Sequence, residues 1–544
     1  MKFVPLSKFL STIPSPKGVV VTNAPPCAQI GGAILRKGGT AVDAAIAAML
    51  SEGVAAPNTM GVGGGFIMTI YKKDTGVVHT LDSREVAPLA ATEDMFGSDT
   101  NLCTRGGLSA AVPGELKGYW EVYQKHGGAV PWKDLLQPSI DLCKNGVPIS
   151  TFVKRIAALD VEVLSNDEGL KKMFVDPETS KPYEYIKRPW LRKTLEEVAT
   201  GGADVLYGGK LTQKFVDDIR DNGGIITEDD MTCYKPEWKT PIQMDLPCGQ
   251  TLYTSPLPGC GLVLALILNI LQDFLDLSHP SSTNNFSKIV ESFKFAFGQR
   301  TKLGDPNFAD FSTLIRRLTS VDYARTIREL VPNQTCQDPT FYGAKTTGTI
   351  ISDATTANIC VVAPNGDAVV ATSSINFDWG AGFMSKSTGI ILNNTMDDFS
   401  SPTILSGYRL PPSRVNFIQP GKRPLSSMCP SIILDKNGDV EMVVGAAGGP
   451  KIITSVALVI IKHLWFDLGL QEAVSSQRFH HQLFPMKIQF EQNMDLVDAL
   501  HQLGHDYEIQ TRLGFNAVTA ISRKSGTLEA AFDPRRGGQK DFVF

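Results

Sequence analysis

The amino-acid sequence predicts an α/β protein, because short apolar runs typical of buried strands alternate with segments of helical periodicity. In residues 17–53 a strand pattern is followed by two helix patterns, and residues 357–375 contain two strand patterns separated by a turn. Residues 261–271 and 452–466 are strongly apolar but too short to cross a bilayer, so we expect two buried helices there. Both kinds of secondary structure are therefore expected to contribute to the core.

The composition is that of a globular protein with a substantial core. Of the 544 residues, 42% are hydrophobic and 20% are charged. The net charge is −4 and no basic stripe is present, so a nucleic-acid partner is not expected. Eight histidines and nine cysteines show no metal-ligand spacing, so no metal ion is expected. An odd number of widely spaced cysteines predicts buried thiols rather than a disulfide framework.

The first elements follow one another closely along the chain. Three strands and two helices are expected, the strands at 17–23, 66–71 and 77–82 and the helices at 28–39 and 40–53. The glycine-rich residues 58–66 are not a phosphate loop, because no Lys-Ser or Lys-Thr pair follows them. They form a tight turn that either brings backbone near a site or is purely structural.

The middle of the chain, residues 150–330, is predicted to be mostly helical. Its expected elements are helices at 211–224 and 287–306, a capping box at 227–230, strands at 240–246 and 250–256 and a loop at 278–285. Residues 331–354 are turn-rich and weakly periodic, which makes them the best candidate for a boundary.

A threonine stands immediately before the strand pair of residues 357–375. Thr356 precedes the first strand, Ser374 lies near the end of the second, and Asn376 follows. A threonine becomes an effective nucleophile when it is an N-terminus, because its own α-amine, with a pKa of ~7.7–8.0, then serves as the base. This chemistry requires peptide cleavage before Thr356. On these residues alone, a β-branched residue that begins a strand is the simpler interpretation.

Three further segments carry candidate binding residues. Arg84, at the end of a predicted strand, could capture a carboxylate through paired donors, or could be a surface residue paired with Glu85. Asp398 lies in a turn, where acidic residues commonly cap a helix or face solvent. Gly448 and Gly449 follow a predicted strand, and backbone NH groups at such a turn either receive an oxyanion or belong to an ordinary β–α connection.

These motifs, in this order, resemble those of the gamma-glutamyltranspeptidases, members of the N-terminal-nucleophile hydrolase superfamily. The matching segments are SREVAP at 83–88, the stretch 355–376, PLSSMCP at 424–430 and VVGAAGGPKI at 443–452, and the resemblance extends over about residues 18–540. It implies a four-layer α/β/β/α sandwich made from one precursor, with a large subunit (18–355) and a small subunit (356–544). Residues 1–17 are then an N-terminal tail, which could be a remnant of a targeting segment.

The resemblance also implies a reaction and a role for nine residues. After self-cleavage before Thr356, the enzyme would transfer the γ-glutamyl group of glutathione or a related compound to water, an amino acid or a dipeptide, without a cofactor. The implied catalytic residues are Thr356, Ser374, Gly448 and Gly449. The implied substrate-binding residues are Arg84, Ser426 and Ser427 for the α-carboxylate, and Asn376 and Asp398 for the α-ammonium group.

The sequence departs from the family pattern at several positions. Asn358 replaces a histidine, Cys360 a serine, Ser374 a threonine, Asp378 and Trp379 an aromatic pair, and Thr395 a glutamate. Losing that glutamate would remove a charge-assisted hydrogen bond worth ~1.5–3 kcal/mol. We expect the substitutions at 358, 374, 378, 379 and 395 to cluster around one pocket. The alternative function is therefore a catalytically weakened or inactive paralogue, acting as a secreted binding protein, and a third is an enzyme with a shifted γ-glutamyl substrate.

Members of the family are commonly secreted or membrane-anchored, so an extracellular or secretory location is expected. Glycosylation sequons at Asn285, Asn333 and Asn393 fit that route. A signal segment is not evident, because Pro5 and Lys8 interrupt the apolar start of the chain.

Overall fold

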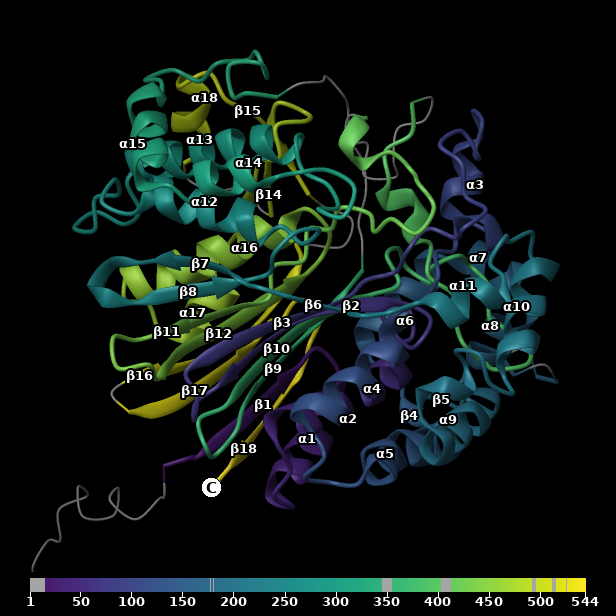
Figure 1. The fold of residues 1–544 in the computed structure, drawn as a ribbon. Coiled ribbons are helices and arrows are strands. Elements are labelled where there is room, and N and C mark those ends of the chain that lie inside the picture. Colours follow the sequence, from purple (N-terminus) through teal and green to yellow (C-terminus); the bar gives the residue numbers. More distant parts are fainter. Residues whose placement is uncertain are drawn as a thin grey trace, which may run out of the picture.

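Two antiparallel sheets lie face to face between two layers of helices (Figure 1). The computed structural model describes residues 15–176, 178–179, 181–344, 355–402, 412–491, 496–510, 515–524 and 526–544. Most of the N-terminal tail and residues 345–354 of the predicted boundary segment therefore lie outside the described residues. The arrangement confirms the predicted four-layer α/β/β/α sandwich.

The first sheet has seven strands, and the strand pair of residues 357–375 lies near its centre. Its strands, in spatial order, are β18 (Gln539–Val543), β1 (Gly18–Thr22), β9 (Ala357–Val362), β10 (Ala368–Ser374), β2 (Gly65–Lys72), β3 (Val77–Ser83) and β6 (Glu237–Lys239). Each of the strands predicted in the first part of the chain is present. β9 and β10 are wholly buried, as expected for central strands covered on both faces.

The second sheet has six strands and packs against the first through apolar side chains. In spatial order they are β17 (Thr527–Phe532), β16 (Ala517–Lys524), β12 (Val440–Ala447), β11 (Ser431–Leu434), β8 (Thr251–Thr254) and β7 (Ile242–Asp245). Val362 of β9, Val443 of β12 and Ile521 of β16 belong to the layer of side chains between the sheets. This layer fixes the position of the hairpin relative to the second sheet.

Helices cover the outer face of the first sheet. The main ones are α1 (Cys27–Arg36), α2 (Ala41–Ala55), α4 (Glu115–His126), α5 (Trp132–Asn145) and α9 (Pro189–Gly201). α2 is buried along its whole length, because its small alanine side chains allow close packing. Shorter helices lie around them: α3 (Thr100–Thr104), α6 (Thr151–Leu159), α7 (Val161–Asn166), α8 (Glu168–Phe174), α10 (Thr212–Asp221) and α11 (Glu228–Cys233), with the small sheet β4 (Val147–Pro148) and β5 (Tyr185–Ile186).

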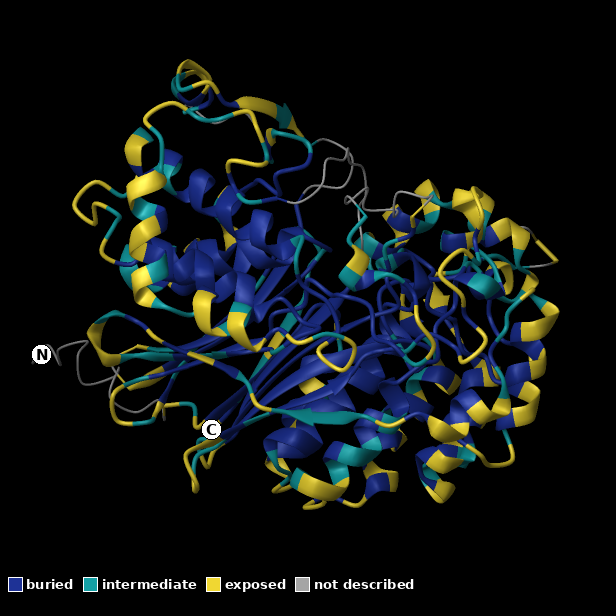
Figure 2. Cartoon of the chain, turned by 45° about the horizontal axis from the view of Figure 1, so that its top comes forward, coloured by how far each residue is buried: buried dark blue, intermediate teal, exposed yellow. Residues whose placement is uncertain are grey.

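The helices over the second sheet include both strongly apolar segments. They are α12 (Gly261–Leu271), α13 (Thr283–Arg300), α14 (Ser312–Leu318), α15 (Val321–Leu330), α16 (Lys451–Ile460), α17 (Leu470–Ser475) and α18 (Val497–Gln502), beside a sheet of β13 (Phe479–His480), β14 (Lys487–Phe490) and β15 (Asp506–Ile509). α12 and α16 are fully buried, as predicted (Figure 2). Among the described residues, no helix is long and apolar enough to span a bilayer.

α13 differs from the predicted helix at both ends. It begins at Thr283, inside the expected loop, because the Ser282 side chain accepts a hydrogen bond from the Asn285 backbone NH and caps the helix. It ends at Arg300 rather than near residue 304. The shift matters because it makes Arg300 the last residue of a helix that reaches the cavity described below.

The structure agrees with the prediction for the cysteines but leaves only one of the three glycosylation sequons accessible. All nine cysteines are free and six are buried, which confirms the prediction of thiols. Asn285 and Asn393 are fully buried, and their side-chain amides donate to backbone carbonyls, so neither can accept a glycan in the folded protein. Among the three sequons only Asn333 is exposed.

Candidate active site

The hairpin places Thr356 and Ser374 side by side at one end of the first sheet. Antiparallel pairing sets Ala357 of β9 opposite Ser373 of β10, so the residues just outside that pair face each other. Thr356 is 4% exposed, and its Oγ1 donates to Ser374 Oγ at 3.4 Å. The register of two central strands therefore fixes the separation of these hydroxyl groups.

Ser374 also contacts the peptide group that precedes Thr356. Its hydroxyl donates to the Thr355 carbonyl oxygen at 2.9 Å and accepts from the Asn376 backbone NH at 2.8 Å. Asn376 has a φ of 75°, a left-handed conformation that asparagine tolerates well, and its carbonyl accepts from the Thr355 NH. A hydrogen-bonded chain thus runs from the Thr356 hydroxyl through Ser374 to the carbonyl on which cleavage would occur.

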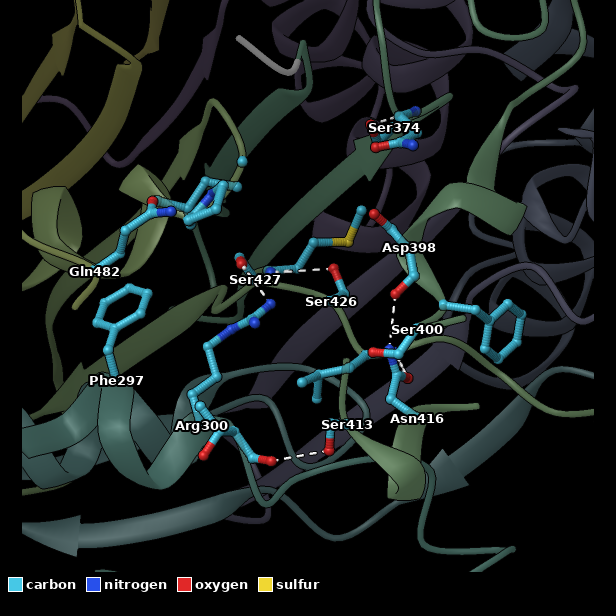
Figure 3. Close-up of a pocket in the computed structure, with 18 of the residues that line it drawn as sticks. Phe297, Arg300, Ser374, Asp398, Ser400, Ser413, Asn416, Ser426, Ser427 and Gln482 are labelled. Atoms are coloured by element: carbon cyan, nitrogen blue, oxygen red, sulfur yellow. Dashed lines mark hydrogen bonds between the residues drawn. The ribbon is translucent and has the colours of Figure 1, made fainter. Parts of the chain in front are cut away.

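A cavity opens beside Thr356 and Ser374 (Figure 3). It collects side chains from both sheets and from the loops between them. The predicted residues that line it are Arg84, Thr356, Ser374, Asn376, Asp398, Ser426, Ser427 and Gly449, and the remaining lining residues include Phe297, Arg300, Asn416, Met428, Gln482 and Phe484. Eight of the nine sequence-predicted site residues therefore line one cavity.

Arg84 and Asp398 form an ion pair on the wall of the cavity. Arg84 follows β3, Asp398 ends the 3-10 turn Thr395–Asp398, and Nη2 lies 2.7 Å from Oδ2. Arg84 is buried rather than on the surface, and its Nη1 also lies 3.3 Å from Glu85 Oε2. Burial raises the pKa of Asp398, and the Arg84 guanidinium opposes that shift. Within this ion pair the two charges offset each other.

Ser426 and Ser427 precede β11 and line the same cavity as Asp398 (Figure 3). The Ser427 hydroxyl accepts a hydrogen bond from Arg300 Nη2 at 3.2 Å. The sequence analysis did not select Arg300, because a cation in the last turn of a helix is common and favourable there. Its position at the cavity depends on how α13 packs, which the sequence does not encode locally.

The glycine pair follows β12 and precedes α16. Both residues have positive φ angles, 123° for Gly448 and 57° for Gly449. A Cβ on Gly448 would lie 2.4 Å from the Asn516 Cβ, so a side chain would not fit without a shift. Gly449 lines the cavity, whereas Gly448 is not among its lining residues.

Most of the family departures lie behind the wall of the cavity rather than on it. Of these residues only Ser374 lines the cavity. Trp379 packs its ring against Phe174, and Asp378 accepts a hydrogen bond from Asn58 Nδ2 at 2.8 Å. Thr395 donates to Glu85 Oε1 at 2.8 Å and is fully buried.

Asn358 lies between the two sheets instead of in the cavity. Its Nδ2 donates to Thr519 Oγ1 of β16 at 2.7 Å, and its Oδ1 accepts from Thr372 of β10 at 2.8 Å. Cys360, on the same face of β9, bonds to Thr519 as well, and burial raises its pKa to about 12. The substitutions at 358 and 360 therefore alter packing between the sheets and do not contact the site.

Known proteins resemble the whole chain. The gamma-glutamyltranspeptidase family model matches residues 27–543. Scoloptoxin SSD14 of Scolopendra dehaani is 40% identical, over 96% of this chain and 92% of the toxin. Glutathione hydrolase 2 of Arabidopsis thaliana is 36% identical, over 98% of this chain and 94% of the hydrolase.

Solved structures agree with these sequence matches. Cephalosporin acylase from Bacillus halodurans superposes with a TM-score of 0.84 at 25% identity, over 99% of both chains. A gamma-glutamyltranspeptidase from Pseudomonas nitroreducens complexed with L-DON is 31% identical, with a TM-score of 0.53 over 58% of this chain and 96% of that chain. With its family motifs gathered at one cavity and relatives matched along nearly all of its length, the chain belongs to the gamma-glutamyltranspeptidase family.

Proposed function

We propose that the protein is a self-cleaving gamma-glutamyltranspeptidase that hydrolyses glutathione or a related γ-glutamyl compound. The observation that carries this proposal is the chain of hydrogen bonds from Thr356 through Ser374 to the Thr355 carbonyl, at a cavity that also holds an Arg84–Asp398 pair. Relatives named glutathione hydrolases, in plants, yeast and mammals, support it.

The first stage is cleavage of the chain before Thr356. Thr356 Oγ attacks the Thr355 carbonyl carbon and gives its proton to Ser374, whose own proton is already directed at the carbonyl oxygen. The C–N bond then breaks, the Thr356 nitrogen takes up the proton, and an ester joins Thr355 to Thr356 Oγ. Water hydrolyses the ester, which leaves a carboxylate on Thr355 and a free α-amine on Thr356.

The two fragments are expected to remain together after the cut. β1 of the large fragment pairs with β9 and β18 of the small one, and β2 pairs with β10. In the second sheet β8 pairs with β11 across the same division. Because both sheets contain strands from both fragments, separating the fragments would expose the core.

The second stage is transfer of the γ-glutamyl group. The free α-amine accepts the Thr356 Oγ proton, Oγ attacks the γ-carbonyl carbon, and the leaving amine departs with a proton. The oxyanion is received by the backbone NH groups of Gly449 and Gly448, which are fixed donors that need no reorganisation. Water, an amino acid or a dipeptide then attacks the acyl-enzyme and returns Thr356 to its free form.

The charges of the cavity complement the α-amino-acid end of the substrate. The substrate ammonium would bind Asp398, with the Asn376 side chain beside it, and its carboxylate would bind Arg84, Ser426 and Ser427. Binding then adds charge-assisted contacts from the ligand to both members of the Arg84–Asp398 pair. No metal or cofactor participates in this scheme.

The alternative, an inactive paralogue acting as a binding protein, rested on substitutions expected around one pocket. Those at 358, 378, 379 and 395 do not line the cavity, which favours the enzyme. We also propose a secretory location, for which the exposed Asn333 is a candidate glycosylation site.

The test is glutathione hydrolysis by the purified wild type beside Thr356→Ala. Glutamate release by the wild type and none by the variant is the expected result. A folded, fragmented wild type that releases glutamate from no γ-glutamyl amide would refute the activity.

A further inference from the structure

Among the described residues, the cavity wall carries more positive than negative charge. The charged lining residues in these ranges are Arg84, Arg300 and Asp398. Asp398 and Glu85 both lie within ion-pair distance of Arg84, so the charge of that arginine is already offset. Arg300 is the remaining cation, and within the described ranges no carboxylate lies close enough to form an ion pair with it.

Among the described residues Arg300 hydrogen-bonds to uncharged groups, and Asp398, which is already paired with Arg84, interacts with it at longer range. Arg300 Nη2 donates to the Ser427 hydroxyl, and the thiol of Cys260 lies beside it with a pKa that burial raises, which keeps the thiol neutral. Arg300 is 9% exposed, and its Nε is buried without a hydrogen-bond partner in the part of the chain that the structure describes. Burying a guanidinium without a counter-ion costs free energy, and a bound anion would offset that cost.

The direction of the side chain indicates where that anion binds. Arg300 extends from the end of α13 toward Ser427 (Figure 3). Ser427 accepts its hydrogen bond from Arg300 and so keeps its own proton available for an acceptor in the cavity. A guanidinium and a hydroxyl that both lack an anionic acceptor form a carboxylate-binding pair.

We propose that Arg300 binds the α-carboxylate of the γ-glutamyl group directly, together with Ser427, and that it sets the preference for donors that carry this carboxylate. This inference rests on the proposed function and adds to it the residue that supplies the uncompensated charge. Arg84 then holds Asp398 and Glu85 in place and shares the carboxylate, whereas Arg300 provides the net attraction. Acyl groups without an α-carboxylate are poor ligands as a consequence.

Calorimetric titration of the full-length protein with two probes tests the proposal without turnover. L-glutamate has the α-carboxylate, and 4-aminobutyrate lacks it but is otherwise the same molecule. For Arg300→Met we expect L-glutamate binding to weaken by about 10- to 100-fold, as for loss of a charge-assisted contact, with 4-aminobutyrate binding unchanged. Arg300→Lys keeps the charge but loses the paired donors of the guanidinium. Its affinity for L-glutamate should lie between those of the wild type and Arg300→Met.

The matched control is Lys302→Met, which removes a cation two residues away that bonds to Gln299 and does not line the cavity. It should leave both affinities as in the wild type. The proposal is overturned if Arg300→Met weakens both probes equally, if it weakens neither, or if the wild type does not prefer L-glutamate. If Arg300→Met does not fold, Arg300→Lys decides by the same comparison. Failure of the proposed function alone would appear differently, as selective L-glutamate binding without glutathione hydrolysis.

Discussion

Replacing Ser374 by alanine should slow self-cleavage sharply while leaving the fold intact. Among the described residues, Ser374 is the only one whose side chain donates a hydrogen bond to the Thr355 carbonyl. Its hydroxyl also accepts a hydrogen bond from the Thr356 hydroxyl. Alanine removes both contacts at once. The nucleophile loses its proton acceptor, and the developing oxyanion loses its donor.

The size of the effect follows from those contacts. Loss of one oxyanion donor costs ~2.7–4 kcal/mol in activation free energy, or ~100- to 1,000-fold in rate. The Asn376 backbone NH also loses its acceptor, which should cost ~1–3 kcal/mol of folding stability. Ser374→Thr retains the hydroxyl and should cleave at a rate near that of the wild type.

The assay is the time course of fragment formation on denaturing gels after synthesis of the precursor. Ser373→Ala is the matched control, because the neighbouring hydroxyl bonds to Glu115 on the other face of β10. It should cleave normally. If Ser374→Ala is folded, as judged by circular dichroism, and still cleaves at the wild-type rate, the proposed role of Ser374 is wrong.

Three other substitutions test residues outside the cavity. Asn358→Leu should lower the free energy of unfolding by ~1–3 kcal/mol, since it leaves the buried Thr372 hydroxyl without its acceptor and removes one of the hydrogen bonds of Thr519. Self-cleavage should continue, and a stalled precursor would contradict the placement of Asn358 between the sheets. Burial raises the pKa of Asp378 to about 7, so the folded state holds a proton that the unfolded state loses near pH 4. The wild type should therefore lose stability relative to Asp378→Asn as pH rises from about 4 to about 7 in urea titrations, and a constant difference would refute this. Thr395→Glu sets a second buried carboxylate against Glu85 and should destabilise the protein by about 3 kcal/mol in thermal melts; an unchanged melting temperature would show that the new side chain turns into the cavity instead.

The sequence could predict those features that depend on local pattern. The β9–β10 hairpin was readable because apolar residues flank a turn of Pro, Asn, Gly and Asp at 364–367. The nine site residues could be selected because each lies in a short motif of the family pattern, not because periodicity identified them.

Features that depend on packing between distant segments could not be predicted. Strand alternation places Asn358, Cys360 and Val362 on one face of β9, but it does not show that β16 lies opposite them. For that reason Asn358 was assigned to the pocket. Arg300 was missed for the same reason, because its role depends on where α13 ends and on which serine lies across from it.

The most direct test of the account is the identity of the fragments in the purified protein. Intact mass and N-terminal sequencing should find one chain beginning at Thr356 in the wild type, and a single uncut chain in Thr356→Ala. That result would establish that Thr356, Ser374 and the Thr355 carbonyl perform the first step together. A wild type that is folded but uncut, or cut at another peptide bond, would contradict the mechanism at its first step.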